Sequence, residues 1–62
     1  MTPEELRAVR AEMGDTQERA AQRYGVTITT YKRWELNMRK IPGIAVILSQ
    51  LLLRDHRRNP GD

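Results

Sequence analysis

Residues 15–35 read Asp-Thr-Gln-Glu-Arg-Ala-Ala-Gln-Arg-Tyr-Gly-Val-Thr-Ile-Thr-Thr-Tyr-Lys-Arg-Trp-Glu, and this stretch decides the fold. Thr16 can cap a first helix with its hydroxyl. Gly25 suits the left-handed backbone conformation with which many helices end. Val26 then fills the turn, and Thr27 caps a second helix. Two short helical segments joined by so tight a turn predict a helix-turn-helix.

The second of these helices, over about residues 28–36, has two chemically different sides. At about 100° per residue, Tyr31 and Trp34 fall on one side. Thr29 and Arg33 fall on the opposite side. We therefore predict that the aromatic side is buried in the core and that the polar side presents hydrogen-bonding groups to a partner.

A helix is predicted on the N-terminal side of this stretch. Thr2 and Glu5 form a capping box around Pro3, which suits the first helical position. Gly14 ends the segment. Its buried stripe is predicted to consist of Leu6, Val9 and Met13.

A last helix is predicted after the loop that ends at Ile41, with Pro42 at its first helical position. The wide apolar stripe expected to complete the core consists of Ile44, Ile47, Leu48, Leu51 and Leu52. Val46 and Leu53 lie on another side, about two helical turns apart. They are either scattered surface residues or part of an interface between two copies of the chain, and we favour the interface.

The size and composition of the chain predict an all-α fold held together by helix packing. The 62 residues include no cysteine, so neither a disulfide nor a cysteine-held zinc ion can stabilise them. No segment alternates apolar and polar residues with the period of a strand. We expect one domain of four to five helices over residues 1–54 and a flexible charged tail over residues 55–62. No segment resembles a signal sequence or is long enough to span a membrane, so a cytoplasmic location is expected.

The net charge of +3 is unevenly distributed along the chain. Residues 1–16 carry two arginines against four carboxylates, a balance of −2. Residues 17–41 carry six basic residues against two acidic ones, a balance of +4, and residues 42–62 carry three against two. The positive charge therefore concentrates on the helix-turn-helix and the loop after it, as a surface that faces phosphates requires.

The pattern as a whole resembles the DNA-binding domains of the lambdoid phage repressor, Cro and XRE family. The resemblance extends from about Leu6 to Leu52 and rests on Thr16-Gln17, Ala21, Gly25-Val26-Thr27, Thr30-Tyr31, Trp34-Glu35 and Ile41-Pro42. Ala20 stands where the family usually has a larger aliphatic residue, and Tyr24 where it usually has leucine. These opposite changes in volume can compensate. The resemblance implies a compact lambda repressor-like fold that binds DNA through its second motif helix, the recognition helix.

The resemblance also implies roles for residues outside the recognition helix. Arg10 would form a partly buried ion pair with Glu35 and so orient that helix. Gln17, at the start of the first motif helix, would bind a DNA phosphate, as the exposed amides of a helix N-terminus also favour, and would brace a side chain of the recognition helix. Arg19 and Arg23 share one helix face and are either phosphate contacts or solubilising side chains.

The outward side of the recognition helix is predicted to contact base pairs. Arg33 can bind the O6 and N7 atoms of guanine, and the methyl groups of Thr29 and Ile28 can pack on a thymine methyl. Lys32 lies beside them. The residues predicted to contact phosphates here and in the following loop are Thr27, Thr30, Arg39 and Lys40.

These residues argue against an enzyme, since no catalytic set, cofactor motif or metal-ligand cluster is present. We predict a sequence-specific regulator that binds a double-stranded operator with inverted repeats as a homodimer. A small repressor of phage or prophage type fits best, without a small-molecule effector, because so short a chain leaves little room for a sensor domain. The alternative is an antitoxin-like or other protein-interaction module that keeps the same fold.

Overall fold

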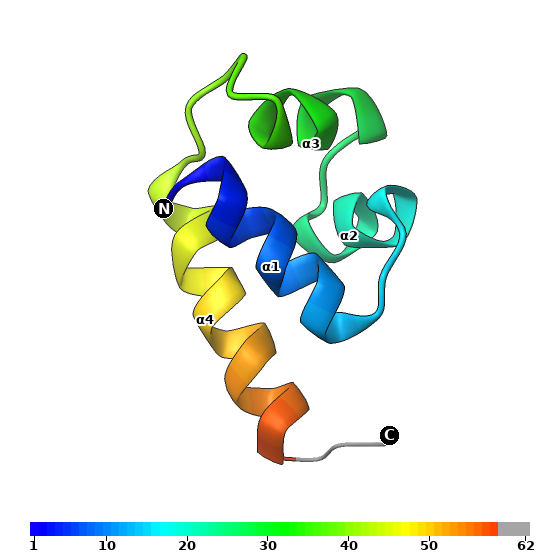
Figure 1. The fold of residues 1–62 in the computed structure, drawn as a ribbon, viewed down its shortest axis with the longest axis vertical. Coiled ribbons are helices and arrows are strands. Elements are labelled where there is room, and N and C mark those ends of the chain that lie inside the picture. The colour runs from blue at the N-terminus through cyan, green and yellow to red at the C-terminus, as the bar shows by residue number, and fades with distance from the viewer. Residues whose placement is uncertain (59–62) are drawn as a thin grey trace.

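The computed structural model describes residues 1–58, which form four α-helices and no strand. Helix α1 spans Pro3–Met13, α2 spans Gln17–Tyr24, α3 spans Ile28–Glu35 and α4 spans Gly43–Arg58. Helix α3 crosses one end of the molecule, α2 packs against α3, and α1 lies beside both α3 and α4 (Figure 1). The predicted all-α class is confirmed, with the helix-turn-helix formed by α2 and α3.

The helix boundaries follow the capping residues read from the sequence. The hydroxyl of Thr16 accepts a hydrogen bond from the amide of Arg19 at 3.1 Å, and that of Thr27 accepts one from the amide of Thr30 at 3.3 Å. Gly25 ends α2 at a φ of 69°, where a side chain would strain the backbone. The predicted caps of α1 are also present: Thr2, Glu5 and Gly14.

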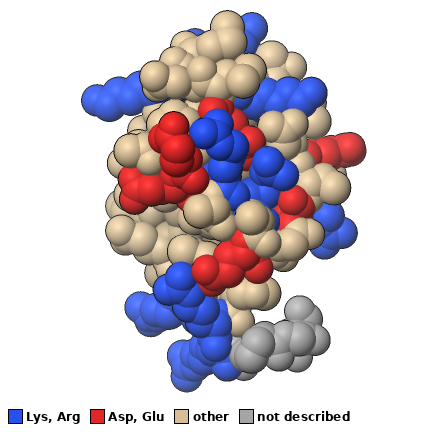
Figure 2. All heavy atoms as spheres, viewed as in Figure 1, with Lys and Arg blue, Asp and Glu red and all other residues tan. Residues whose placement is uncertain are grey.

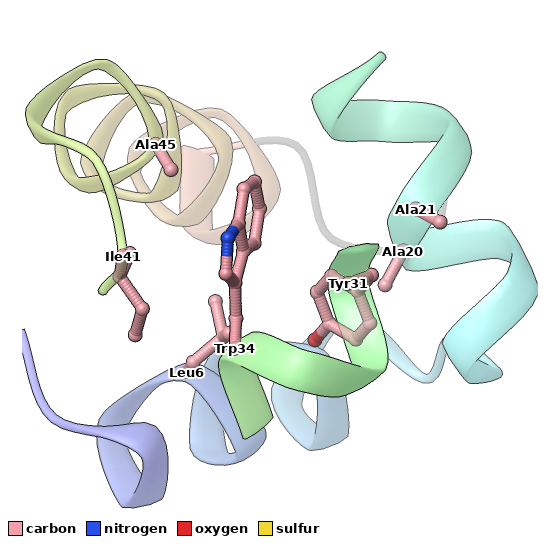
Figure 3. Close-up of a cluster of buried hydrophobic side chains, with 7 residues drawn as sticks. All are labelled: Leu6, Ala20, Ala21, Tyr31, Trp34, Ile41 and Ala45. Atoms are coloured by element: carbon pink, nitrogen blue, oxygen red, sulfur yellow. The ribbon is translucent and has the colours of Figure 1, made fainter. Parts of the chain in front are cut away.

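The core lies where α3 meets the other three helices. Figure 3 shows Tyr31 pointing from α3 towards Ala20 on α2, and Trp34 rising from α3 towards Ala45 on α4. Tyr24 adds a third ring, stacked on Tyr31 with centroids 5.9 Å apart. The alanines are small where the aromatic rings need space, which accounts for the volume exchange seen in the sequence.

The inward side of α4 differs from the prediction. Ile44, Ile47 and Leu51 are 72%, 54% and 51% exposed, so placing them in the core is wrong. Ala45 and Ser49 are buried in their place. Leu48 and Leu52, the other members of the predicted stripe, are half-buried.

The space available beside α4 explains why the helix buries a different side from the one predicted. Trp34 and Tyr24 occupy the volume beside the helix, so its inward side needs small residues. Ser49 Oγ lies 2.5 Å from Tyr24 Oη and donates to the carbonyl oxygen of Ala45 at 2.8 Å. A serine can be buried here because its hydroxyl finds these polar partners inside the protein.

The same difference affects the two residues predicted for a dimer interface. Val46 packs against the core, and Leu53 is half-buried in the groove between α1 and α4. The prediction that these two residues lie on the outward side of α4 is therefore wrong, because α4 buries a different side. The outward apolar side consists of Ile44, Ile47 and Leu51.

The ends of α4 also differ slightly from the prediction. Pro42 precedes the helix, and its carbonyl oxygen accepts the amides of Ala45 and Val46 at 3.0 and 3.3 Å. The helix continues through Arg58, so residues 55–58 are helical and not a flexible tail. The rest of the predicted tail, residues 59–62, lies outside the described residues.

Candidate nucleic-acid interface

Helix α3 separates a buried side from an outward side, as its sequence predicts. Tyr31 and Trp34 are 0% and 5% exposed. The side chains on the outward side are those predicted to contact bases, and all of them are exposed: Ile28, Thr29, Lys32 and Arg33. The structure therefore brings the four base-reading candidates onto one accessible helix surface.

A buried carboxylate anchors the C-terminal end of α3. Glu35 is 3% exposed and accepts hydrogen bonds from Arg10 Nε at 2.7 Å and Arg10 Nη2 at 3.2 Å. Burial raises the pKa of Glu35, but the hydrogen bonds that its carboxylate accepts from Arg10 and Gln17 lower it. The lowering is larger, so the pKa of Glu35 lies below its usual value. The ion pair implied by the family resemblance is present, and it joins α1 to α3.

Gln17 belongs to the same network. Its side-chain Nε2 donates to Glu35 Oε1 at 3.0 Å, so this side chain braces the recognition helix. The hydroxyl of Tyr31 is buried nearby and makes no hydrogen bond with residues 1–58. Its pKa is raised, first by burial and then by the proximity of the Glu35 carboxylate.

A second buried carboxylate, Asp15, was not recognised in the sequence. Its side chain is 4% exposed and binds Arg23 through two hydrogen bonds, with Arg19 Nε 3.8 Å away. The pKa of Arg23 is raised, mainly by the hydrogen bond to Asp15. The four-residue spacing of Asp15 and Arg19 was a signal for such a pair. Both arginines predicted as possible phosphate contacts therefore have an intramolecular partner.

The basic residues without such a partner are concentrated at α3 and the loop that follows it. Within residues 1–58, no carboxylate lies within 4.0 Å of these side chains: Lys32, Arg33, Arg39 and Lys40. Arg54 and Arg58 share this property at the far end of α4, where basic residues suit the negative end of the helix dipole. Figure 2 shows mixed charges over α1 and basic side chains projecting from the upper part of the molecule, where α3 lies.

The remaining phosphate candidates flank α3. Thr27, the N-cap, donates its hydroxyl to the hydroxyl of Thr30 at 3.1 Å, so the two lie together at the start of the helix. Arg39 and Lys40 are exposed in the loop after α3. Asn37 turns that loop with a positive φ of 60°, a conformation that asparagine tolerates better than most residues.

Residues 1–58 contain neither a membrane-spanning helix nor a cluster of metal ligands. None of their helices combines the length and the apolar character that a membrane crossing requires. No group of three or more histidine, cysteine and acidic side chains in this part of the chain could hold a metal ion.

Comparison with known proteins adds one match. The family model described as "Helix-turn-helix" matches residues 6–50, which include α2, α3, most of α1 and the first half of α4. No curated protein and no solved structure matched the chain.

Proposed function

Because this chain belongs to the XRE/Cro type of helix-turn-helix family, whose members are DNA-binding domains of transcription regulators, we propose that it is a sequence-specific repressor. Its resemblance to lambdoid repressors and Cro supports a regulator of phage or prophage type. The proposed ligand is a double-stranded operator with inverted repeats. Helix α3 lies in the major groove of each half-site.

The observation that carries this proposal is the position of the basic residues that lack an intramolecular partner. These residues lie on the outward side of α3 or in the loop after it: Lys32, Arg33, Arg39 and Lys40. By contrast, Arg10 and Arg23 are bound to buried carboxylates. Pairing inside the protein thus leaves the positive charge where a polyanion would meet the recognition helix.

The proposed base contacts are made by the exposed side chains of α3. Arg33 binds the O6 and N7 atoms of a guanine, and the methyl groups of Ile28 and Thr29 pack on a thymine methyl. Lys32 extends the same surface towards a neighbouring base pair. These contacts supply the discrimination between sequences.

The proposed phosphate contacts lie on either side of these residues. Arg39 and Lys40 contact the backbone from the loop after α3, and the hydroxyls of Thr27 and Thr30 contact it at the start of that helix. Gln17 contributes its backbone amide at the start of α2, because its side chain is bound to Glu35. Arg19 and Arg23 contact phosphates only by giving up part of their bonding to Asp15.

Two copies of the chain are proposed to occupy the two half-sites. The outward apolar side of α4, Ile44, Ile47 and Leu51, offers a surface that is the same on both copies and suits a two-fold contact. Three aliphatic side chains cannot supply the roughly 800 Å² per partner that a stable complex of proteins usually buries. The pairing is therefore expected on DNA, where both copies are held close together.

The test is a selection of duplexes from a randomised library by the full chain, followed by titration of the selected duplex and a shuffled one at two salt concentrations. We expect tighter binding to the selected duplex, an inverted repeat in its sequence, and a loss of affinity at higher salt. Weak binding that is equal on both duplexes would contradict a sequence-specific repressor. It would favour the protein-interaction alternative, for which the exposed side of α4 is the available surface.

A further inference from the structure

The last turn of α3 has a complete set of hydrogen bonds, and one of them comes from another helix. A helix leaves the carbonyl groups of its final four residues without partners in the helix. In α3, three of these carbonyl oxygens accept amides of the following loop at 2.8–3.3 Å, namely those of Lys32, Arg33 and Trp34. The fourth, the carbonyl oxygen of Glu35, accepts Arg7 Nη1 at 2.7 Å.

Arg7 and Arg10 therefore bind the same residue in two different ways. They lie about one turn apart on α1, and Arg10 binds the carboxylate of Glu35 while Arg7 binds its main-chain carbonyl. Glu4 lies 3.5 Å from Arg7 Nη2 and helps to hold the guanidinium in place. A cation at this position also suits the negative end of the α3 dipole.

We propose that Arg7 is a positioning residue that sets the orientation of the recognition helix for reading base pairs. The bond to a backbone atom constrains the tilt of α3, because a carbonyl, unlike a side chain, cannot turn independently of its helix. Helix α3 has eight residues, too few to hold its conformation without tertiary contacts. This inference rests on the proposed function and adds to it a residue that lies outside the DNA-facing surface.

The experiment compares three variants of the full chain. Arg7→Met keeps a similar length and removes the donor, whereas Arg7→Lys keeps a donor and the charge. Arg57→Met is the matched control, because it removes the same charge and also breaks a link between two helices, the one to Glu12. Arg57 lies in the last turn of α4, and that end of α4 is at the opposite end of the molecule from α3 (Figure 1). Each variant is first shown to be folded at the temperature used.

The first readout needs no DNA. Amide hydrogen exchange in the free protein reports how firmly the last turn of α3 is held. We expect Arg7→Met to speed exchange of the Leu36 and Met38 amides by about tenfold, the effect of losing one charge-assisted hydrogen bond. Arg7→Lys should restore much of the protection, and Arg57→Met should leave these amides unchanged.

The second readout is binding to the selected and the shuffled duplex. Arg7→Met should weaken binding to the selected duplex by about tenfold more than Arg57→Met does, which is about 1.4 kcal/mol. On the shuffled duplex the two variants should match, because each has lost one charge.

Three results would overturn the inference. Unchanged exchange in Arg7→Met would show that the bond does not hold α3, and faster exchange spread evenly over all helices would show a contribution to global stability alone. If Arg7→Met loses more affinity than Arg57→Met, and by the same factor on both duplexes, Arg7 would be a phosphate contact and not a positioning residue. If the wild-type chain itself fails to distinguish the duplexes, the proposed function fails, while the exchange readout still decides whether Arg7 holds α3.

Discussion

Four arginines in and around the helix-turn-helix fall into two groups according to what surrounds each guanidinium. Arg10 and Arg23 bind buried carboxylates, and the pKa of each is raised, mainly by the hydrogen bond to its carboxylate. Arg33 and Arg39 lie on or beside the outward side of α3, with no carboxylate within 4.0 Å in the described part of the chain. The first group stabilises the fold, and the second group is available to bind an anion.

Arg33 and Arg39 should respond differently to substitution. We expect Arg33→Ala to lose about 1–3 kcal/mol of binding to the selected duplex and to relax specificity at one or two base pairs. Arg39→Ala should weaken binding to all sequences alike and reduce the slope of log affinity against log salt concentration by about one. Titrations of both variants on selected and shuffled duplexes check this. Equal losses on both duplexes for Arg33→Ala would contradict its role as a base reader.

The proposed contact of Ile28 with a thymine methyl can be tested by changing the DNA as well as the protein. Replacing a contacted thymine by deoxyuridine removes one methyl group and leaves the base pairing unchanged. We expect a loss of about 0.8 kcal/mol at that position for the wild-type chain, the value of one buried methyl group. The same change should have little effect on Ile28→Ala, which a double-mutant cycle would show. A wild-type chain indifferent to uracil at every thymine would exclude this contact.

At the scale of elements, α3 and α4 depend on their neighbours in different ways. Helix α3 is short and is held on one side by Tyr31 and Trp34 and at its end by Arg7 and Arg10. Helix α4 is longer, and its inward side was selected by the space that the aromatic residues leave. The recognition helix is therefore supported on its inward side and at its C-terminal end, while residues 1–58 leave the outward apolar side of α4 at least half exposed.

The outward side of α4 predicts how two copies cooperate. Ile47→Lys places a charge in the middle of this side, so it should lower affinity for a duplex with two half-sites and leave affinity for one half-site unchanged. Gln50→Lys is the control, because it adds the same charge at an exposed position of α4 that faces the groove beside α1. Band-shift titrations on both duplexes measure the effect. Equal behaviour of the two variants on the two-site duplex would exclude this surface as the dimer contact.

At the scale of the whole molecule, stability rests on a small core and on a few carboxylates that bind across helices. Glu35 joins α1, α2 and α3 through Arg10 and Gln17, and Glu12 joins α1 to α4 through Arg57. A domain of this size has little stability in reserve. The charge state of the Glu35 carboxylate should therefore influence the folding of the entire chain.

This leads to a pH dependence with a defined sign. The pKa of Glu35 is lower in the folded chain than its ordinary value of 4.5. The contribution of Glu35 to stability is therefore fully present above pH 4.5 and is lost as the pH falls through the pKa of the folded chain. We expect the free energy of unfolding, measured with urea, to fall below about pH 5. Glu5 and Glu12 act in the same direction but are exposed.

The Glu35 contribution can be separated from that of the exposed carboxylates. Glu12→Gln should leave most of the pH dependence in place, while Glu35→Gln should flatten it. If Glu35→Gln does not fold, a carbon-13 titration of the Glu35 carboxyl in the wild-type chain gives its pKa directly. A value at or above 4.5 would contradict the role assigned to the Arg10 pair.

The sequence by itself determined the helices and the motif, because the signals for them are local. Threonine caps at Thr16 and Thr27 and the glycine at Gly25 act within one helical turn, so they could be read without knowing the rest of the fold. The two sides of α3 were equally legible, since aromatic residues and charged ones alternate there at helical spacing.

Only the tertiary structure decided the side of α4 that is buried and the basic residues that remain unpaired. Helix α4 has apolar residues on more than one side, and the choice depended on the volume that Tyr24 and Trp34 leave, which no local pattern contains. Likewise, the contact of Arg7 with Glu35 joins residues far apart in the sequence. Packing and pairing of this kind depend on how distant segments meet, and so they follow from the three-dimensional arrangement of the helices.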